Sequence, residues 1–263
     1  MRLVAPLSLV LCLLTGVPVG AQPSLEARGT RAPAAAIGPV KIILLDVCLH
    51  AEFEQAVART RTAVPVEINT SAMDPAACAL DVYRAKSALT ALAKKLEAER
   101  AAATRRHAPV PVTLLYTGTT LHGEGAGATW IQVVKRLSQS ALVISPSGND
   151  PALTPSEVWP SSQFSFKVGN APGGSLSGTV GKEVAIYLDF GLSVEVVVNG
   201  RRLTGGASST SAMLTAAHLA NVLARGTGQR LSPSQLLAKL KASFREALIQ
   251  EEDLEGRLGA VLR

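Results

Sequence analysis

Aromatic residues are scarce in this chain of 263 residues, which contains five Phe, three Tyr and two Trp, or 4 % in all. Proteins that bind single-stranded nucleic acid stack successive bases on aromatic side chains, and this chain has too few for such a surface. The net charge of +6 does not change this conclusion, because the basic pairs Arg105-Arg106 and Arg201-Arg202 are isolated from each other. We therefore expect no nucleic-acid partner.

Cysteine is rarer still, with three residues in the chain. Cys12 lies in the apolar leader described below, which leaves Cys48 and Cys78 in the rest of the chain. In an oxidising compartment these two residues are candidates for one disulfide. A single pair gives no framework pattern, so two buried free thiols are the alternative. We predict no metal site and no cofactor.

The chain also lacks an apolar run long enough to span a bilayer. Leu3–Leu14 is apolar but too short, and it follows a basic start at Arg2. Val19-Gly20-Ala21 supplies the small residues that a signal peptidase reads, so we predict a signal peptide over 1–21, the alternative being an uncleaved anchor. The mature chain is then exported, periplasmic or extracellular, with no transmembrane segment after cleavage. Residues 22–38, rich in Ala, Pro and Arg, read as a flexible linker before one domain over 39–263.

Hydrophobic residues, by contrast, are abundant at 47 % and recur in short runs typical of buried parallel strands. Such runs alternate with helical segments, which predicts an α/β fold of three layers, with a mostly parallel sheet flanked by helices. The expected strands cover 40–45, 64–69, 110–116, 141–145, 163–169 and 183–189. A hairpin partner at 193–198 precedes Asn199-Gly200, a strong turn signal. The expected helices cover 50–60, a segment from Ser71 or Asp74 to 104, 130–137, one containing Ser211, 232–249 and the C-terminal end.

Polar residues stand where several of these elements meet. Asp46 ends the first strand, Asn149 lies in the turn after the 141–145 strand, and Ser211 lies where a Gly- and Ser-rich turn enters an apolar helix. A helix N-terminus offers free backbone N–H groups to a developing negative charge, although Ser is also common there as a simple cap. Because ligands of parallel sheets bind outside the carboxyl ends of the strands, these residues are candidates for a site.

Five segments, in order, resemble the motifs of the subtilisin-like serine peptidases, the subtilases. The interval from Asn149 to Ser211 is close to that of the family, whereas the interval from Asp46 to Asn149 is short. The resemblance covers about residues 39 to 245. The segments are 43–50 (triad aspartate strand), 115–118 (Met-Ser-Leu-Gly cleft segment), 143–150 (Ala-Ala-Gly-Asn turn), 159–169 (Tyr-Pro-Ser and Val-Gly-Ala pieces) and 209–213 (Gly-Thr-Ser-x-Ala nucleophile motif).

The resemblance implies a subtilisin-like fold and a role for each matched residue. Asp46 would be the triad aspartate, Ser211 the nucleophile and Asn149 the donor to the oxyanion. A bound peptide would contact the cleft segment Tyr116, Thr117 and Gly118. Two departures stand inside the nucleophile motif, where Ser209 replaces the glycine and Thr215 replaces the usual proline.

The family's histidine helix, His-Gly-Thr-x-Val-Ala-Gly, has no match between Asp46 and Tyr116, so we expect that helix to be deleted. His122, after the cleft segment, is the candidate replacement base. His50 follows Asp46 closely and is expected to point along its own helix, His107 lies in a loop, and His218 is expected in the core. The sedolisin alternative, a glutamate and an aspartate on one helix, finds Asp81 for its aspartate but Ala77 at its glutamate position.

A subtilase without its histidine loses the general base that takes the serine proton. We therefore expect an exported subtilase homologue that is impaired or inactive and that binds a peptide or protein in its cleft. The alternative is an active serine hydrolase in which an unconventional base such as His122 activates Ser211. A structural envelope protein without a ligand is a third hypothesis.

Overall fold

The computed structural model describes residues 37–46, 48–71, 73–74, 79–80, 82–117, 127–155, 158, 160 and 162–263. The chain divides into two units, Met1–Ala35 and Ala36–Arg263, and all described residues belong to the second. The predicted signal peptide and all of the predicted linker up to residue 36 lie outside the described residues, so both stay predictions. None of the helices that are described is long and apolar enough to cross a membrane.

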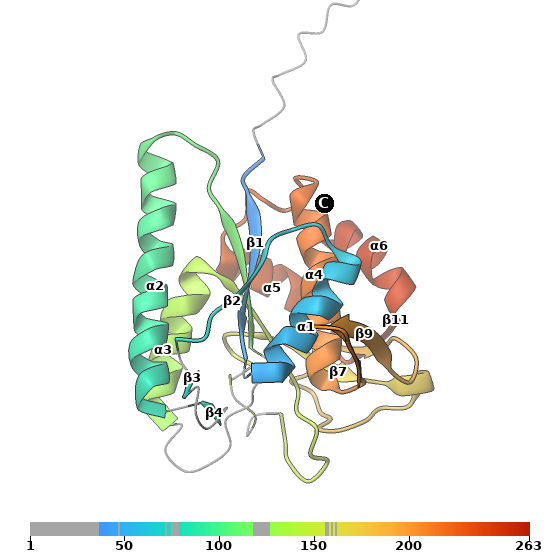
Figure 1. Ribbon diagram of the computed structural model, residues 1–263. Helices are drawn as coiled ribbons and strands as arrows, with labels where there is room; N and C mark the ends of the chain where they lie inside the picture. Colours follow the sequence, from blue (N-terminus) through green and yellow to red (C-terminus); the bar gives the residue numbers. More distant parts are fainter. Residues whose placement is uncertain are drawn as a thin grey trace, which may run out of the picture. The chain divides into compact units, whose positions relative to one another are not determined.

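Seven strands form one sheet in the order β11-β8-β7-β6-β5-β1-β2, and every neighbouring pair in it is parallel. The predicted mostly parallel α/β sheet is therefore confirmed (Figure 1). The strands are β1 Val40–Leu45, β2 Val66–Ile68, β5 Val112–Thr117, β6 Leu142–Pro146, β7 Phe166–Asn170, β8 Ile186–Asp189 and β11 Ala247–Gln250.

Helices cover both faces of this sheet because successive strand side chains point to opposite faces. Ile42 and Leu44 of β1 belong to a core shared with α1, α4, α5 and α6, whereas Ile43 and Leu45 belong to a second core with α2 and α3. Figure 1 shows α2 and α3 on one side of β1 and α1 and α4 on the other. The helices are α1 Cys48–Arg61, α2 Val82–Arg105, α3 Gly127–Ser140, α4 Ser208–Ala224, α5 Pro233–Ser243 and α6 Glu251–Leu262.

The predicted helix over 232–249 is wrong in its second half. Helix α5 ends at Ser243, and 247–250 form the edge strand β11, which pairs with β8. Glu246 has a φ of 50°, a left-handed conformation that interrupts the helix before β11 begins. Ile249 is buried while Leu248 is exposed, as expected for an edge strand covered on one face. Pairing with the free edge of β8 makes this segment a strand rather than a helix, and no local sequence pattern reveals that edge.

Other boundaries also differ from the prediction. The long helix begins at Val82 rather than at Ser71 or Asp74, because Met73–Asp74 (β3) and Ala79–Leu80 (β4) pair as short antiparallel strands. The helix that contains Ser211 begins at Ser208. The latter difference is small, but it makes Ser209 the second residue of α4.

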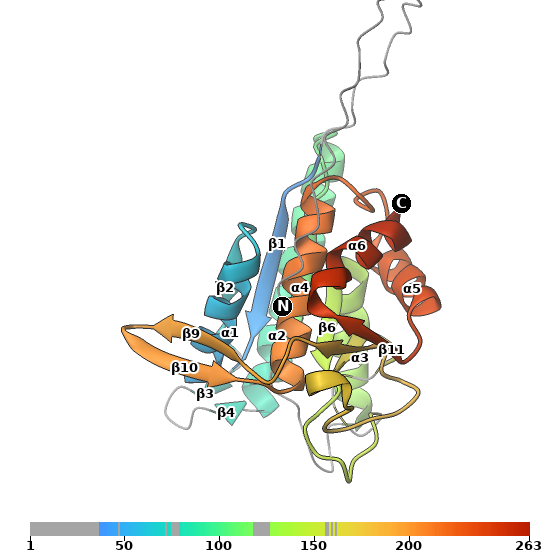
Figure 2. The same cartoon turned by 90° about the vertical axis from the view of Figure 1, so that its right-hand side faces the viewer.

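The predicted hairpin is confirmed as β9 Val194–Val198 and β10 Arg201–Gly205, joined through Asn199-Gly200. Both turn residues have positive φ, 49° and 76°, which Asn and Gly adopt most readily. Figure 2 shows the hairpin projecting beside α1, with β10 leading back toward α4. The hairpin thus delivers the chain directly to the serine-rich start of α4.

Candidate active site

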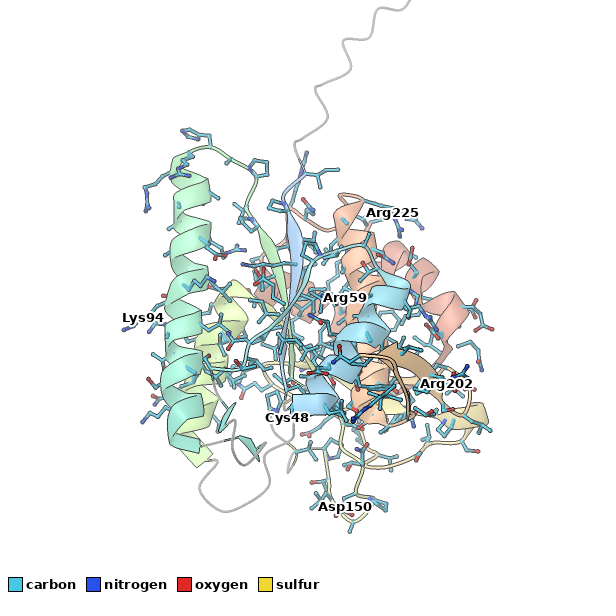
Figure 3. The ribbon with its side chains drawn as sticks, viewed as in Figure 1. Cys48, Arg59, Lys94, Asp150, Arg202 and Arg225 are labelled. Atoms are coloured by element: carbon cyan, nitrogen blue, oxygen red, sulfur yellow. The ribbon has the colours of Figure 1, made fainter. Side chains whose placement is uncertain are left out.

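Asp46 lies immediately after β1, and α1 begins at Cys48. Cys48 has a φ of 40°, so the chain turns sharply from strand into helix (Figure 3). Because this link is short, Asp46 and His50, which are four residues apart in the chain, both lie at the carboxyl end of the sheet. The Asp46 side chain is fully buried, and its Oδ2 accepts a hydrogen bond from His50 Nδ1.

The other ring nitrogen of His50 faces α4. His50 Nε2 lies 3.2 Å from the hydroxyl oxygen of Ser209, the second residue of that helix. With the Nδ1 proton donated to Asp46, Nε2 is left to accept the Ser209 hydroxyl proton. His50 thus reaches along its own helix to Asp46, as expected, and also across to α4, which sequence reasoning did not anticipate. The three side chains form an acid–imidazole–hydroxyl series of the kind that activates a serine nucleophile.

Ser211 does not take part in this series. Its side chain is buried, and its hydroxyl hydrogen-bonds Asn170 Oδ1 at 3.3 Å, away from His50. Side chains two residues apart on a helix point about 200° apart, so Ser209 and Ser211 face opposite sides of α4. The structure thus brings Asp46 and Ser209 together, not Asp46 and Ser211. The sequence held a signal for this, because Ala207-Ser208-Ser209 fits the Gly-Thr-Ser pattern two residues earlier.

Asn149 sits beside the start of α4, where the sequence placed it. Its Oδ1 accepts hydrogen bonds from the Ser208 backbone N–H at 3.1 Å and from the Ser208 hydroxyl at 2.7 Å. Because the Ser208 backbone N–H must face an acceptor, the Asn149 side chain points its Oδ1 toward Ser208. Its NH2 group therefore points away from Ser208. The cap residue Ala207 makes no side-chain bond, and the first helical bond runs from Ser211 N. The Ser209 N–H is thus one of the orphan donors of a helix start.

The three cleft residues have different outcomes. Tyr116 is fully buried, and its hydroxyl donates to the Ser209 carbonyl oxygen at 3.2 Å, so it supports Ser209 from inside the fold. Thr117 is also buried. Gly118 lies outside the described residues, as do the candidate base His122 and the sedolisin-type Asp81. Cys48 is disulfide-bonded, while Cys78 is outside the described part, so their pairing stays a prediction.

Sequence reasoning missed Glu54, one turn beyond His50 on α1. Its side chain is fully buried, and Oε1 lies 3.5 Å from His50 Nε2 and 3.2 Å from the Thr210 hydroxyl that donates to it. Burial raises the pKa of Glu54 to about 7, although the charge of His50 opposes the rise. Burial is the largest influence on the pKa of His50 and lowers it, but the hydrogen bond to Asp46 and the charges of Asp46 and Glu54 together outweigh burial, so the net shift is upward. The spacing of Asp46, His50 and Glu54 at four-residue intervals was the available signal.

A cavity of about 370 Å³ opens beside His50 and Ser209. It lies between α1 and the segment that runs from β10 into α4, and it is mostly apolar. Its lining comprises Leu49, His50, Phe53, Leu203, Thr204, Gly205, Gly206, Ala207, Ser209 and Thr210. Gly205 is required here, because a side-chain carbon at this position would lie 2.4 Å from the Phe53 ring. Ser209 and His50 thus line a space that accepts an apolar group.

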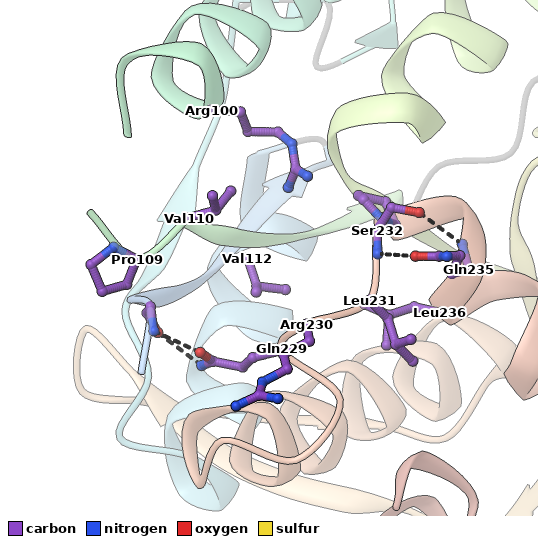
Figure 4. A pocket seen from close by; sticks show the side chains of 12 residues that line it. Arg100, Pro109, Val110, Val112, Gln229, Arg230, Leu231, Ser232, Gln235 and Leu236 are labelled. Atoms are coloured by element: carbon purple, nitrogen blue, oxygen red, sulfur yellow. Dashed lines mark hydrogen bonds between the residues drawn. The ribbon is translucent and has the colours of Figure 1, made fainter. Parts of the chain in front are cut away.

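A second cavity, of about 420 Å³, lies at the opposite edge of the sheet, beside Gly38, Val110 and Val112 (Figure 4). It is lined at the start of α5 by Ser232 and Gln235, which satisfy each other's polar groups in a capping box. Gly38, Val110 and Val112 precede or begin their strands, so this cavity lies at the amino ends of the strands. Ligands of parallel sheets bind at the carboxyl ends. Among the described residues, no group of three or more His, Cys, Asp or Glu could hold a metal ion.

No protein-family model and no curated protein sequence matches the chain. Solved structures do match. A cold-adapted subtilisin-like serine proteinase superposes with a TM-score of 0.58 at 13 % identity, covering 81 % of this chain and 89 % of that one. The A subunit of an AB5 toxin from E. coli gives 0.59 at 12 % identity, covering 86 % and 93 %. A structure of the subtilase cytotoxin SubAB assembly gives 0.56 at 12 % identity, covering 85 % and 90 %.

Likenesses at such low identity establish the fold alone. The chain has a subtilisin-like α/β fold, as the resemblance of its motifs predicted.

Proposed function

We propose that this protein is a serine hydrolase that cleaves peptides, with Ser209 as the nucleophile. His50 is the general base, Asp46 orients it, and Asn149 with the Ser209 N–H binds the oxyanion. The observation that carries the proposal is the position of His50, which contacts Asp46 through Nδ1 and Ser209 through Nε2. A buried carboxylate, an imidazole and a hydroxyl in this order are rarely needed for stability alone.

The reaction would follow the acyl-transfer scheme of a serine triad. Ser209 Oγ attacks the carbonyl carbon of the substrate while its proton passes to His50 Nε2. The resulting oxyanion accepts hydrogen bonds from the Asn149 amide and the Ser209 backbone N–H. His50 then gives the proton to the leaving nitrogen, the C–N bond breaks, and an acyl ester on Ser209 remains. Water, deprotonated by His50, hydrolyses this ester and restores the Ser209 hydroxyl.

Three features support a peptide substrate and an exported protein. The fold is shared with a subtilisin-like proteinase, and the mostly apolar cavity beside His50 can accept an apolar side chain of a substrate. The disulfide at Cys48 favours an oxidising compartment, in agreement with the predicted signal peptide over 1–21. Periplasmic or extracellular location is part of the proposal.

A fluorophosphonate probe, which labels activated serines, tests this proposal. We expect labelling of the mature protein, loss of labelling in Ser209→Ala and His50→Ala, and retained labelling in Ser211→Ala. The Ser211 variant is the matched control, since it removes a hydroxyl two residues away on the same helix. Labelling that disappears in Ser211→Ala but persists in Ser209→Ala would contradict the assignment.

The second candidate is a protein that binds peptides in this cleft without cleaving them. The observation in its favour is Glu54, whose carboxylate lies near the same His50 nitrogen that Ser209 needs. Absence of labelling in the wild type, together with peptide binding that is equal in Ser209→Ala, is the result expected of this candidate.

A further inference from the structure

Glu54 is buried at a cost that its structural contacts do not explain. Its side chain has no exposed surface, and its Oε2 has no hydrogen-bond partner among the described residues. An ionised carboxylate in such a place is strongly destabilising unless it is paired, and an apolar residue would fill this helix position more stably. A residue of this kind is typical of a functional site.

The contacts that Glu54 does make are with the candidate triad. Oε1 lies 3.5 Å from His50 Nε2, which itself lies 3.2 Å from the Ser209 hydroxyl. Thr210, the next residue of α4, donates to the same Oε1. Glu54 and Ser209 therefore approach one edge of the imidazole, while Asp46 holds the other edge. The histidine lies between two buried carboxylates.

Within the part of the chain that the structure describes, His50 is the positive partner of Glu54. Burial is the main cause of the raised pKa of Glu54, which also responds to the charges of His50 and Asp46; burial, followed by the charge of Glu54, raises the pKa of Tyr116 on β5. Helix α4 offers the hydroxyls of Ser209 and Thr210, and β9 packs on α1 with the apolar Val194 and Val196. When Glu54 is ionised, a protonated His50 thus compensates its negative charge.

We propose that Glu54 is a positioning residue of the Asp46–His50–Ser209 group, which shares the Nε2 edge of His50 with Ser209 and sets the pH above which His50 accepts the Ser209 proton. With Glu54 ionised, the imidazolium is held between two carboxylates and its Nε2 proton blocks acceptance of another. As pH rises, that proton leaves to solvent, and Nε2 becomes free for the Ser209 hydroxyl. The catalytic part of this inference rests on the proposed function.

The test compares the wild type with Glu54→Gln, which keeps the shape of the side chain and its acceptor for Thr210 but carries no charge. We expect the acid limb of kcat/KM to move to lower pH by about one unit, because an opposite charge at this distance raises a histidine pKa by that order. Glu52→Gln is the matched control on the same helix, since Glu52 contacts Asn199 of the hairpin instead. Its acid limb should coincide with that of the wild type.

A purely structural role for Glu54 would change the melting temperature without moving the acid limb. Coincident limbs in the wild type and Glu54→Gln would therefore overturn the inference. Titration of the His50 ring by NMR gives a second readout that needs no catalysis, and its midpoint should fall by a similar amount in Glu54→Gln. If the wild type hydrolyses nothing while this midpoint shifts, the proposed function fails and the coupling of Glu54 to His50 stands; an unshifted midpoint overturns the coupling.

Discussion

The first four residues of α4 have different hydrogen-bond partners, although all four carry the same functional group. Ser208 fixes the amide of Asn149, Ser209 faces His50, Thr210 donates to Glu54 and Ser211 bonds to Asn170. All four carry a hydroxyl group, and all four are buried. Helical rotation of about 100° per residue sends each hydroxyl in a different direction. The direction of each hydroxyl, rather than the residue type, therefore determines its partner.

At this scale we predict the effect of removing the oxyanion donor. Asn149→Ala should lower kcat for a fluorogenic peptide by about 10²- to 10³-fold with little change in KM, because the lost hydrogen bond forms chiefly in the transition state. Asn69→Ala, which removes an amide from a surface turn with Ser71, is the control and should retain full activity. Equal kcat in Asn149→Ala and the wild type would remove Asn149 from the site.

Among the elements, α1 is joined to α4 and α6 by an ionic cluster at its far end, in addition to its buried apolar face. Arg61 at the end of α1 pairs with Glu251 at the start of α6, at 2.6 Å, and His218 of α4 lies between Glu251 and Glu255. His218 is thus hydrogen-bonded, as the sequence indicated, but it is partly buried in an ionic cluster rather than in the core. The cluster joins three helices on one face of the sheet and holds α1, with its histidine, against α4.

The stability of this cluster should depend on pH. Partial burial alone would raise the pKa of Glu251, but hydrogen bonds from His218 and Arg61 lower it to about 2. A depressed carboxyl pKa stabilises the fold fully above the unfolded value, and this contribution disappears as pH falls toward 2. Glu251→Gln should therefore lower the free energy of unfolding by about 2 kcal/mol at pH 7 and by much less near pH 2 to 3.

Urea titration of the folded protein at the two pH values measures this difference. Glu252→Gln changes the neighbouring exposed residue of α6 and should have little effect at either pH. A loss in Glu251→Gln that is equally large at pH 7 and near pH 2 would show that charge is not its cause.

For the molecule as a whole, the disulfide at Cys48 ties the start of α1 to a second cysteine. We predict that this partner is Cys78, so that peptide mapping without reductant finds the two in one fragment. Cys48→Ser should lower the free energy of unfolding by about 3 kcal/mol, as should reduction of the wild type, whereas Cys12→Ser should change nothing. A Cys48 fragment linked to any other residue would contradict the pairing.

The sequence by itself determined the layers and the parallel sheet, because strands buried on both faces, such as Val40–Leu45, carry continuous apolar runs. It also placed Asp46 and Asn149 at strand ends, since those positions depend on local order along the chain. The tertiary structure alone decided the rest of the site. Whether His50 reaches Ser209 depends on how α1 packs on α4, and whether Ser209 or Ser211 meets it depends on where α4 begins. The contact of His50 with Ser209 joins residues 159 positions apart, so no local pattern specifies it, although the Ala207-Ser208-Ser209 segment indicates which serine stands at the helix start.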